Sequence, residues 1–253
     1  MFIGVGTPIP VIANLPGSSR PGGGGAPAFE YTAIDNNFSM EFDGNDTFID
    51  AGFLEPLSQV TNFTISMWIK PSQVPPASTQ AIFSFYQSNG GRIEIYPGSS
   101  NLITFVNSAG NSLSSTAAAF PAQAPANGWY HIALVYDGTF TDPDPVLQNQ
   151  GRIKPYVNAV YTAAGVSGTQ QSQSANFNTT PPKRATIGAR SIDYATPTLD
   201  FDGHIDEFAI FPVSLSAERI QNIYDATVNN PGKVADLSET PEGIPAVWYR
   251  MGD

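Results

Sequence analysis

The stretch Thr61-Asn-Phe-Thr-Ile-Ser-Met-Trp-Ile69 alternates polar and apolar side chains. One face of a strand is predicted to carry Phe63, Ile65, Met67 and Ile69, because successive side chains of a strand point to opposite faces. Phe38-Ser-Met-Glu-Phe42 shows a similar alternation further upstream. Strands with one apolar face need a second layer to cover that face, which favours a β-sandwich.

Further segments downstream also have the composition of strands and are separated by turn residues such as Asp137-Gly138. These segments are Ala81–Tyr86, Arg92–Tyr96, Leu102–Val106, Tyr130–Tyr136, Arg152–Val157, Ala185–Ile187 and Gly203–Phe211. So many strands with so little helix predict an all-β fold made of two antiparallel sheets.

One short helix is expected near the C-terminus, over residues 214–226. Ser214 or Ser216 would cap its N-terminus, and Glu218 falls in its first turn. The stripe of Ile220, Ile223 and Tyr224 has helical spacing and predicts packing against the sheet.

The composition narrows the classes of partner. The chain has 253 residues, no cysteine and a net charge of −11, so it depends on no disulfide and would repel a phosphate backbone. No apolar run approaches the roughly 18 residues that a membrane span needs. We therefore expect neither nucleic acid binding nor membrane insertion.

Three regions are expected along the chain. Residues 1–28 are rich in Gly and Pro and predict an extended N-terminal arm, either disordered or docked on a neighbouring subunit through its apolar side chains. Residues 29–228 form the sandwich. Residues 229–253 form a C-terminal extension that packs on the domain or on a partner. Within the sandwich, the polar stretch Gly165–Pro182 predicts a long exposed loop.

Three motifs, in this order, resemble the laminin-G-like, pentraxin-like branch of the concanavalin A-like lectin/glucanase folds. The first runs from Phe42-Asp-Gly-Asn-Asp to Met67-Trp-Ile-Lys-Pro71, the second is Trp129-Tyr-His-Ile-Ala-Leu-Val-Tyr-Asp-Gly138, and the third is Phe201-Asp-Gly-His-Ile-Asp-Glu-Phe-Ala-Ile-Phe211. The resemblance implies a jelly-roll sandwich. It does not identify a ligand, because this fold hosts lectins, adhesins, enzymes and structural modules.

The resemblance also implies a calcium site between the last long strand and the first. Asp206 would supply a carboxylate, the turn at Asp43 and Gly44 a backbone carbonyl, and Asp46 a further ligand, since calcium takes several hard oxygen ligands. The alternative is that these aspartates cap turns and pair with nearby donors. An ion bound there would be structural.

Catalytic residues are not expected. The two histidines, His131 and His204, both lie in strand motifs and are interpreted as structural. Glycosidases need two opposed carboxylates, whereas the strand Arg92–Tyr96 holds Glu94 alone. Trp68 and Trp129 are expected in the core. Tyrosines near loops or strand ends would suit a glycan, but ligand-binding residues stay undefined; these tyrosines are Tyr86, Tyr96, Tyr156, Tyr161 and Tyr194.

The two ends of the chain, with the closing Trp248-Tyr-Arg-Met-Gly-Asp253, resemble structural proteins of marine bacteriophages. The leading hypothesis is a non-enzymatic protein of a virion surface, in the capsid decoration or the tail fibres, that tethers the particle to glycans. Its arm would bind other virion proteins in a homo-oligomer or lattice. The alternatives are a free or cell-surface carbohydrate-binding module or adhesin and, less favoured, a polysaccharide-degrading enzyme.

Overall fold

The computed structural model describes residues 29–57, 60–86, 92–98, 102–109, 112–119, 128–161, 165–168, 184–192, 195–239 and 243–251. The arm expected over residues 1–28 lies outside these ranges, and so does most of the polar stretch 165–182.

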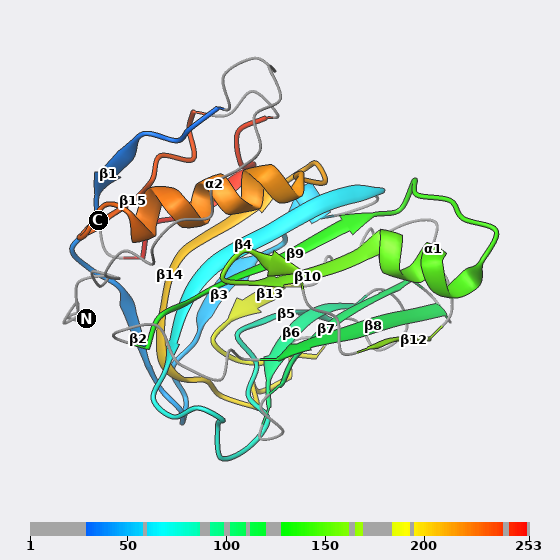
Figure 1. Ribbon diagram of the computed structural model, residues 1–253. Coiled ribbons are helices and arrows are strands. Elements are labelled where there is room, and N and C mark those ends of the chain that lie inside the picture. Colours follow the sequence, from blue (N-terminus) through cyan, green and yellow to red (C-terminus); the bar gives the residue numbers. More distant parts are fainter. Residues whose placement is uncertain are drawn as a thin grey trace.

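Two antiparallel sheets of seven strands each lie face to face, which confirms the predicted sandwich (Figure 1). The helix-side sheet has the order β11 (Val160–Tyr161), β10 (Ile153–Val157), β9 (Tyr130–Asp137), β4 (Asn62–Pro71), β14 (Asp202–Phe211) and β16 (Val247–Tyr249), with β2 (Met40–Asp43) beside β14. The far sheet has the order β12 (Gly165–Gly168), β8 (Ser112–Ala119), β7 (Leu102–Ala109), β6 (Arg92–Pro97), β5 (Phe83–Tyr86), β13 (Ala185–Ile187) and β3 (Ile49–Gly52).

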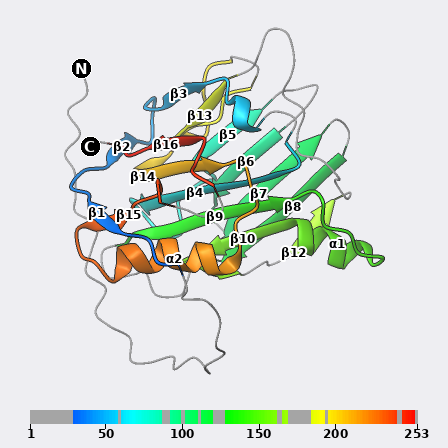
Figure 2. The same cartoon turned by 90° about the horizontal axis from the view of Figure 1, so that it is seen from above.

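The remaining elements are small. They are the pair β1 (Ala33–Asp35) and β15 (Lys233–Ala235), the 3-10 turn η1 (Glu55–Leu57), α1 (Pro145–Arg152) and α2 (Ala217–Val228). Figure 2 shows α2 running along one side of the helix-side sheet. Among the residues that the structure describes, neither helix is long and apolar enough to cross a membrane.

Strand β4 shows why the sequence folds into layers. Its residues Phe63, Ile65, Met67 and Ile69 are fully buried in the core between the two sheets, as the alternation predicts. The opposite face of β4 turns toward α2 and is also buried. The two faces of this strand therefore serve two different packing layers.

Helix α2 covers the outer face of the helix-side sheet. Ser216, one of the two serines predicted as N-cap, caps this helix. Its side chain accepts a hydrogen bond from the backbone N–H of Arg219 at 3.2 Å. Ile220 and Ile223 are buried residues of this helix. Trp68 and Trp129 form a second buried cluster there with Val234, so the expected core role of both indoles is confirmed, under the helix rather than between the sheets.

The structure differs locally from the sequence prediction. A second helix, α1, is present besides the one expected near the C-terminus, and it includes Arg152, which was expected to begin a strand. The stretch Gly165–Gly168, expected in a loop, forms β12 and pairs with β8. Strand β8 itself, Ser112–Ala119, was not predicted, because serine and alanine give no apolar alternation. Both strands are defined by hydrogen bonding to a neighbour instead of by a pattern of their own.

The region after residue 228 adds strands to the same domain. Lys233–Ala235 pairs with β1, and Val247–Tyr249 extends the helix-side sheet beside β14. The indole N–H of Trp248 donates to the Glu207 carboxylate at 2.7 Å. Trp248 thus fastens the C-terminal strand to β14.

Candidate functional site

Strands β5 and β6 belong to the far sheet, which lies away from α2 (Figure 1). Their polar side chains alternate with residues of the core between the sheets and therefore lie on the outer face. The register pairs Ser84 with Glu94 and Tyr86 with Arg92. Directly opposed residues of antiparallel strands lie on the same face, so these side chains are neighbours. The residues on the inner face are fully buried and are Phe83, Phe85, Ile93 and Ile95.

Glu94 is the centre of this outer face. Its side chain is 0% exposed, and it accepts hydrogen bonds from the Ser84 hydroxyl at 3.0 Å and from Nε of Arg190 at 3.0 Å on one oxygen. Its other oxygen accepts from Nε of Arg92. A buried carboxylate is stable when it is paired in this way.

Two tyrosine rings hold the two guanidinium groups in place. The guanidinium carbons of Arg92 and Arg190 each lie 4.9 Å from the centroid of the Tyr86 ring, and 5.9 Å and 6.0 Å from that of Tyr96. Arg92 also donates to the Tyr96 hydroxyl at 3.1 Å. We call Tyr86, Arg92, Glu94, Tyr96 and Arg190 the arginine–tyrosine cluster.

The segment after β13 brings Arg190 to the cluster. Arg190 and Thr198 exchange backbone hydrogen bonds of 2.7 Å and 2.8 Å, which join the two ends of the segment. Leu199 packs against Tyr96 and Ala81. Burial raises the pKa of Tyr96, while the charges of Arg92 and Arg190 oppose this shift. The Tyr96 phenol is therefore neutral at physiological pH and can donate a hydrogen bond.

Three of the four residues predicted for calcium lie together in one turn. Asp43 ends β2 and Gly44 and Asp46 follow it. The Asp43 carboxylate accepts hydrogen bonds from the backbone N–H groups of Asn45 at 3.0 Å and Asp46 at 3.4 Å. A hydrogen bond from the Thr47 side chain lowers the pKa of Asp43. This geometry matches the alternative in which the aspartates cap a turn.

Asp206 lies elsewhere. Asp43 pairs with Asp202, and Asp206 is four residues further along β14, which corresponds to about 13 Å. Asp206 is fully buried and accepts a hydrogen bond from the Asn36 amide at 2.9 Å. It begins the bulge at which β14 shifts register against β4. The structure thus separates Asp206 from Asp43, Gly44 and Asp46, and calcium binding stays a prediction.

Asp200 has a raised pKa, and two of the causes are carboxylates of this turn. Burial raises the pKa of Asp200, and the charges of Asp43 and Asp46 raise it further. Within the described part of the chain, no group of three or more His, Asp or Glu side chains is arranged to hold a metal ion.

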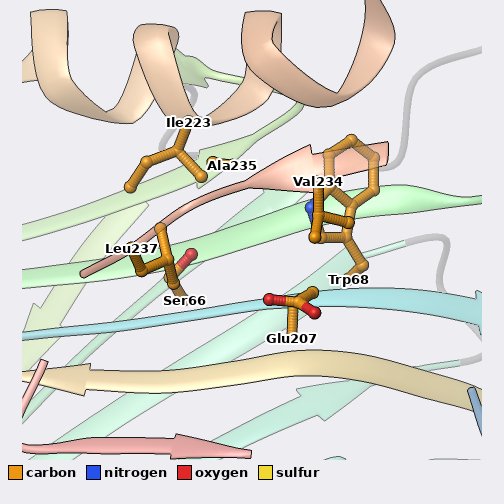
Figure 3. Close-up of a pocket in the computed structure, with 7 residues that line it drawn as sticks. All are labelled: Ser66, Trp68, Glu207, Ile223, Val234, Ala235 and Leu237. Carbon is orange, nitrogen blue, oxygen red and sulfur yellow. The ribbon is translucent and has the colours of Figure 1, made fainter. Parts of the chain in front are cut away.

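The space beneath α2 is a packing void. Its volume is about 10 Å³, which is room for at most one water molecule. Figure 3 shows Ile223 above it, Glu207 and Ser66 below it and Trp68 at one side. Since the lining is apolar apart from Ser66 and Glu207, this void is part of the core.

Two larger cavities lie on the helix side of the molecule. One of about 230 Å³ is lined by Glu30, Tyr31, Asn222, Asp225, Ala226, Asn229 and Asn230. The other, of about 170 Å³, is lined by Glu41, Phe42, Lys70, Pro71, Ser72, Asp202, Gly203 and His204. The tyrosine and the phenylalanine that line them, Tyr31 and Phe42, are buried, so neither of these two rings presents its face to a ligand.

The histidines are structural in their contacts. His131 is 0% exposed, its Nε2 lies 2.9 Å from the Ser66 hydroxyl, and burial lowers its pKa to about 3. His204 is half buried, with Nδ1 at 3.3 Å from the Ser39 hydroxyl. Burial is also the main cause that lowers the pKa of His204.

The tyrosines considered for a glycan have different positions. Tyr86 and Tyr96 belong to the arginine–tyrosine cluster, whereas Tyr156 and Tyr161 face each other across β10 and β11 with their ring centroids 5.9 Å apart. Tyr194 lies outside the described residues. The sequence signal for the cluster is the polar, aromatic face of Arg92–Tyr96, but the contribution of Arg190 has no local signal.

A family model described as the concanavalin A-like lectin/glucanases superfamily, of laminin G type, matches residues 43–221. The matched range covers the second and third motifs and nearly all of the first. No curated protein matches the chain in sequence.

Several solved structures are similar to this chain at low sequence identity. A candidate carbohydrate binding protein from Bacteroides ovatus has a TM-score of 0.53 and 16% identity, over 88% of this chain and 53% of the other. This chain therefore spans about half the length of that protein. A heptameric SAP-like pentraxin from Limulus polyphemus has a TM-score of 0.49 and 19% identity, over 74% of this chain and 81% of the other. Domains LG4-5 of the mouse laminin alpha1 chain have a TM-score of 0.47 and 12% identity, over 74% and 46%.

Proposed function

Because the chain belongs to the concanavalin A-like lectin/glucanases superfamily, we propose that it is a non-enzymatic carbohydrate-binding protein whose ligand contacts the arginine–tyrosine cluster. The observation behind this proposal is the fixed set of donors on the far sheet. Two guanidinium groups are held against two tyrosine rings and a sealed carboxylate. Donors that are ordered before binding lose little entropy when they meet a sugar.

Glu94 supports a binding role over hydrolysis. A glycosidase needs two carboxyl groups about 5 to 10 Å apart with access to the substrate. Glu94 is inaccessible and both its oxygens are occupied. The next carboxylate in its row of paired residues is Asp50, three strands away or about 14 Å along the sheet.

Replacing Tyr86 with alanine tests the binding site. The change removes the ring that both guanidinium groups contact, so we expect affinity for the strongest ligand on a glycan array to fall by about tenfold or more. The melting temperature should change little, because Tyr86 is only half buried.

Tyr161→Ala is the matched control, since Tyr161 is a 45% exposed tyrosine on edge strand β11 of the other sheet. Equal binding by wild type and Tyr86→Ala would refute the site, and a wild type that binds no glycan would refute the function. The same array with added EDTA measures any dependence on calcium.

We further propose that the protein acts on the surface of a phage virion, in the capsid decoration or the tail fibres. The support comes from the sequence: a Gly- and Pro-rich stretch over residues 1–28 with apolar side chains, and a chain without cysteine. In this role the arm binds neighbouring virion proteins, and many weak glycan contacts on one particle add up to strong attachment. The alternative is a carbohydrate-binding module that is free or displayed on a cell.

A reconstruction of purified particles tests the virion role. We expect repeated copies of the sandwich on the capsid or tail, with residues 1–28 in contact with a neighbouring subunit. Absence of the chain from purified particles, measured by mass spectrometry, would favour the alternative.

A further inference from the structure

The arginine–tyrosine cluster concentrates positive charge on an acidic protein. The whole chain has 11 Lys and Arg against 22 Asp and Glu. Two of those 11 lie at this cluster, and since both guanidinium carbons lie 4.9 Å from one ring centroid, they are within about 10 Å of each other. Glu94 balances one of the two charges. The cluster therefore keeps one net positive charge at the surface.

The guanidinium groups of Arg92 and Arg190 also have N–H donors that they do not use within the cluster. An arginine has five N–H donors in a planar fork. Arg190 uses Nε on Glu94, and its two terminal nitrogens have no hydrogen-bond partner among the described residues. Arg92 uses Nε and one terminal nitrogen. Their side chains are 22% and 26% exposed, so both groups reach solvent.

The surroundings strengthen any charge interaction at this place. Glu94 is fully buried beneath the two arginines, and Tyr96 is 7% exposed, so water has little access to one side of each guanidinium group. An ion pair at the edge of such a region is screened less than one on an open surface. Arginine forks bind planar, two-oxygen anions with two parallel hydrogen bonds.

We propose that the cluster binds the acid group of an anionic sugar residue, with Arg190 and Arg92 as its hydrogen-bond donors. The acid group is a carboxylate, as in a uronic acid, or a sulfate ester. The Tyr96 hydroxyl lies beside Arg92 and accepts one of its hydrogen bonds, which fixes the position of that guanidinium group. This inference rests on the proposed glycan binding and names the class of glycan.

Calorimetric titration of the full chain with matched oligosaccharides tests the inference. Trigalacturonate is compared with its neutral methyl ester, and a sulfated galactan oligosaccharide with its desulfated form. For at least one pair, we expect the acidic member to bind at least ten times more tightly, with an affinity that falls several-fold between 50 and 500 mM salt. The pair that discriminates identifies carboxylate or sulfate as the group.

Single substitutions test whether the preference for the acidic ligand depends on Arg190. Arg190→Gln should reduce the preference for the acidic ligand to about twofold or less, and Arg190→Lys should restore only part of it, because lysine keeps the charge and loses the fork. Arg184→Gln is the matched control: Arg184 precedes β13 and pairs with Asp50 at 2.8 Å, outside the cluster. Melting curves show whether each variant is folded.

The outcomes separate the two proposals. If neutral and acidic ligands bind equally, or if Arg190→Gln leaves the preference unchanged, the acidic ligand class is wrong while glycan binding stands. If no sugar of either charge binds, the proposed function itself fails. If Arg190→Gln unfolds, Arg92→Gln repeats the test from the other side of Glu94.

Discussion

Replacing Gly203 with alanine is expected to destabilise the fold by about 4 kcal/mol, the sum of an overpacking cost and a backbone cost. Gly203 has φ +148°, and a Cβ atom at this position would lie 2.3 Å from the carbonyl oxygen of Lys70 and 2.8 Å from Cα of Pro71. Both are backbone atoms of β4, so no side chain can move aside. Strand β14 would have to separate from β4.

The matched control is Gly232→Ala. Gly232 also has a positive φ, +74°, but a Cβ atom there would meet nothing within 4 Å. We expect this variant to lose only the backbone term of about 1–2 kcal/mol. Urea unfolding of both variants measures the difference. Equal losses would show that β14 and β4 are not packed as closely as described.

The second large effect is a loss of stability in acid because of His131. Burial lowers the pKa of His131 to about 3, whereas the unfolded chain has an ordinary histidine pKa of 6.5. Above pH 6.5 both states are neutral and the histidine has no effect. Between pH 6.5 and about 3, His131 is protonated in the unfolded chain and neutral in the folded chain. Stability therefore falls as pH falls.

The expected slope is about 1.4 kcal/mol per pH unit well below pH 6.5. His131→Gln should remove this contribution, since glutamine can keep the hydrogen bond to the Ser66 hydroxyl and does not titrate. Carboxylates also change stability in acid, so the measurement is the difference in slope between wild type and variant over pH 4–6. His204→Gln, at a half-buried histidine, is the control and should change the slope less. Identical slopes for wild type and His131→Gln would mean that His131 is accessible to water.

The strands could be predicted where one apolar face meets the core. Strands β4, β9 and β14 contain the motifs and were predicted nearly to their ends, because their alternation or apolar content is local. Strand β8, with the sequence Ser-Leu-Ser-Ser-Thr-Ala-Ala-Ala, is not predictable in this way, because its small side chains give no apolar alternation although its partner β7 directly precedes it in the chain.

The candidate site was only partly predictable for a different reason, which is that its residues are distant in the sequence. Glu94 stood out in the sequence as a lone carboxylate on a strand. Its partner Arg190 is 96 residues away in the chain, and the antiparallel order of β6, β5 and β13 brings the two together. The bulge at Asp206 could not be predicted from the sequence either. It gives the backbone of Glu207 a positive φ of 51°, which no local motif indicates.

A crystal structure of the full chain with an acidic oligosaccharide tests the central claim most directly. We predict sugar density on the outer face of the far sheet, with acid oxygens within hydrogen-bond distance of Arg190 or Arg92. Sugar bound instead in the cavity beside α2 or in the cavity beside His204, with the arginine–tyrosine cluster empty, would contradict it.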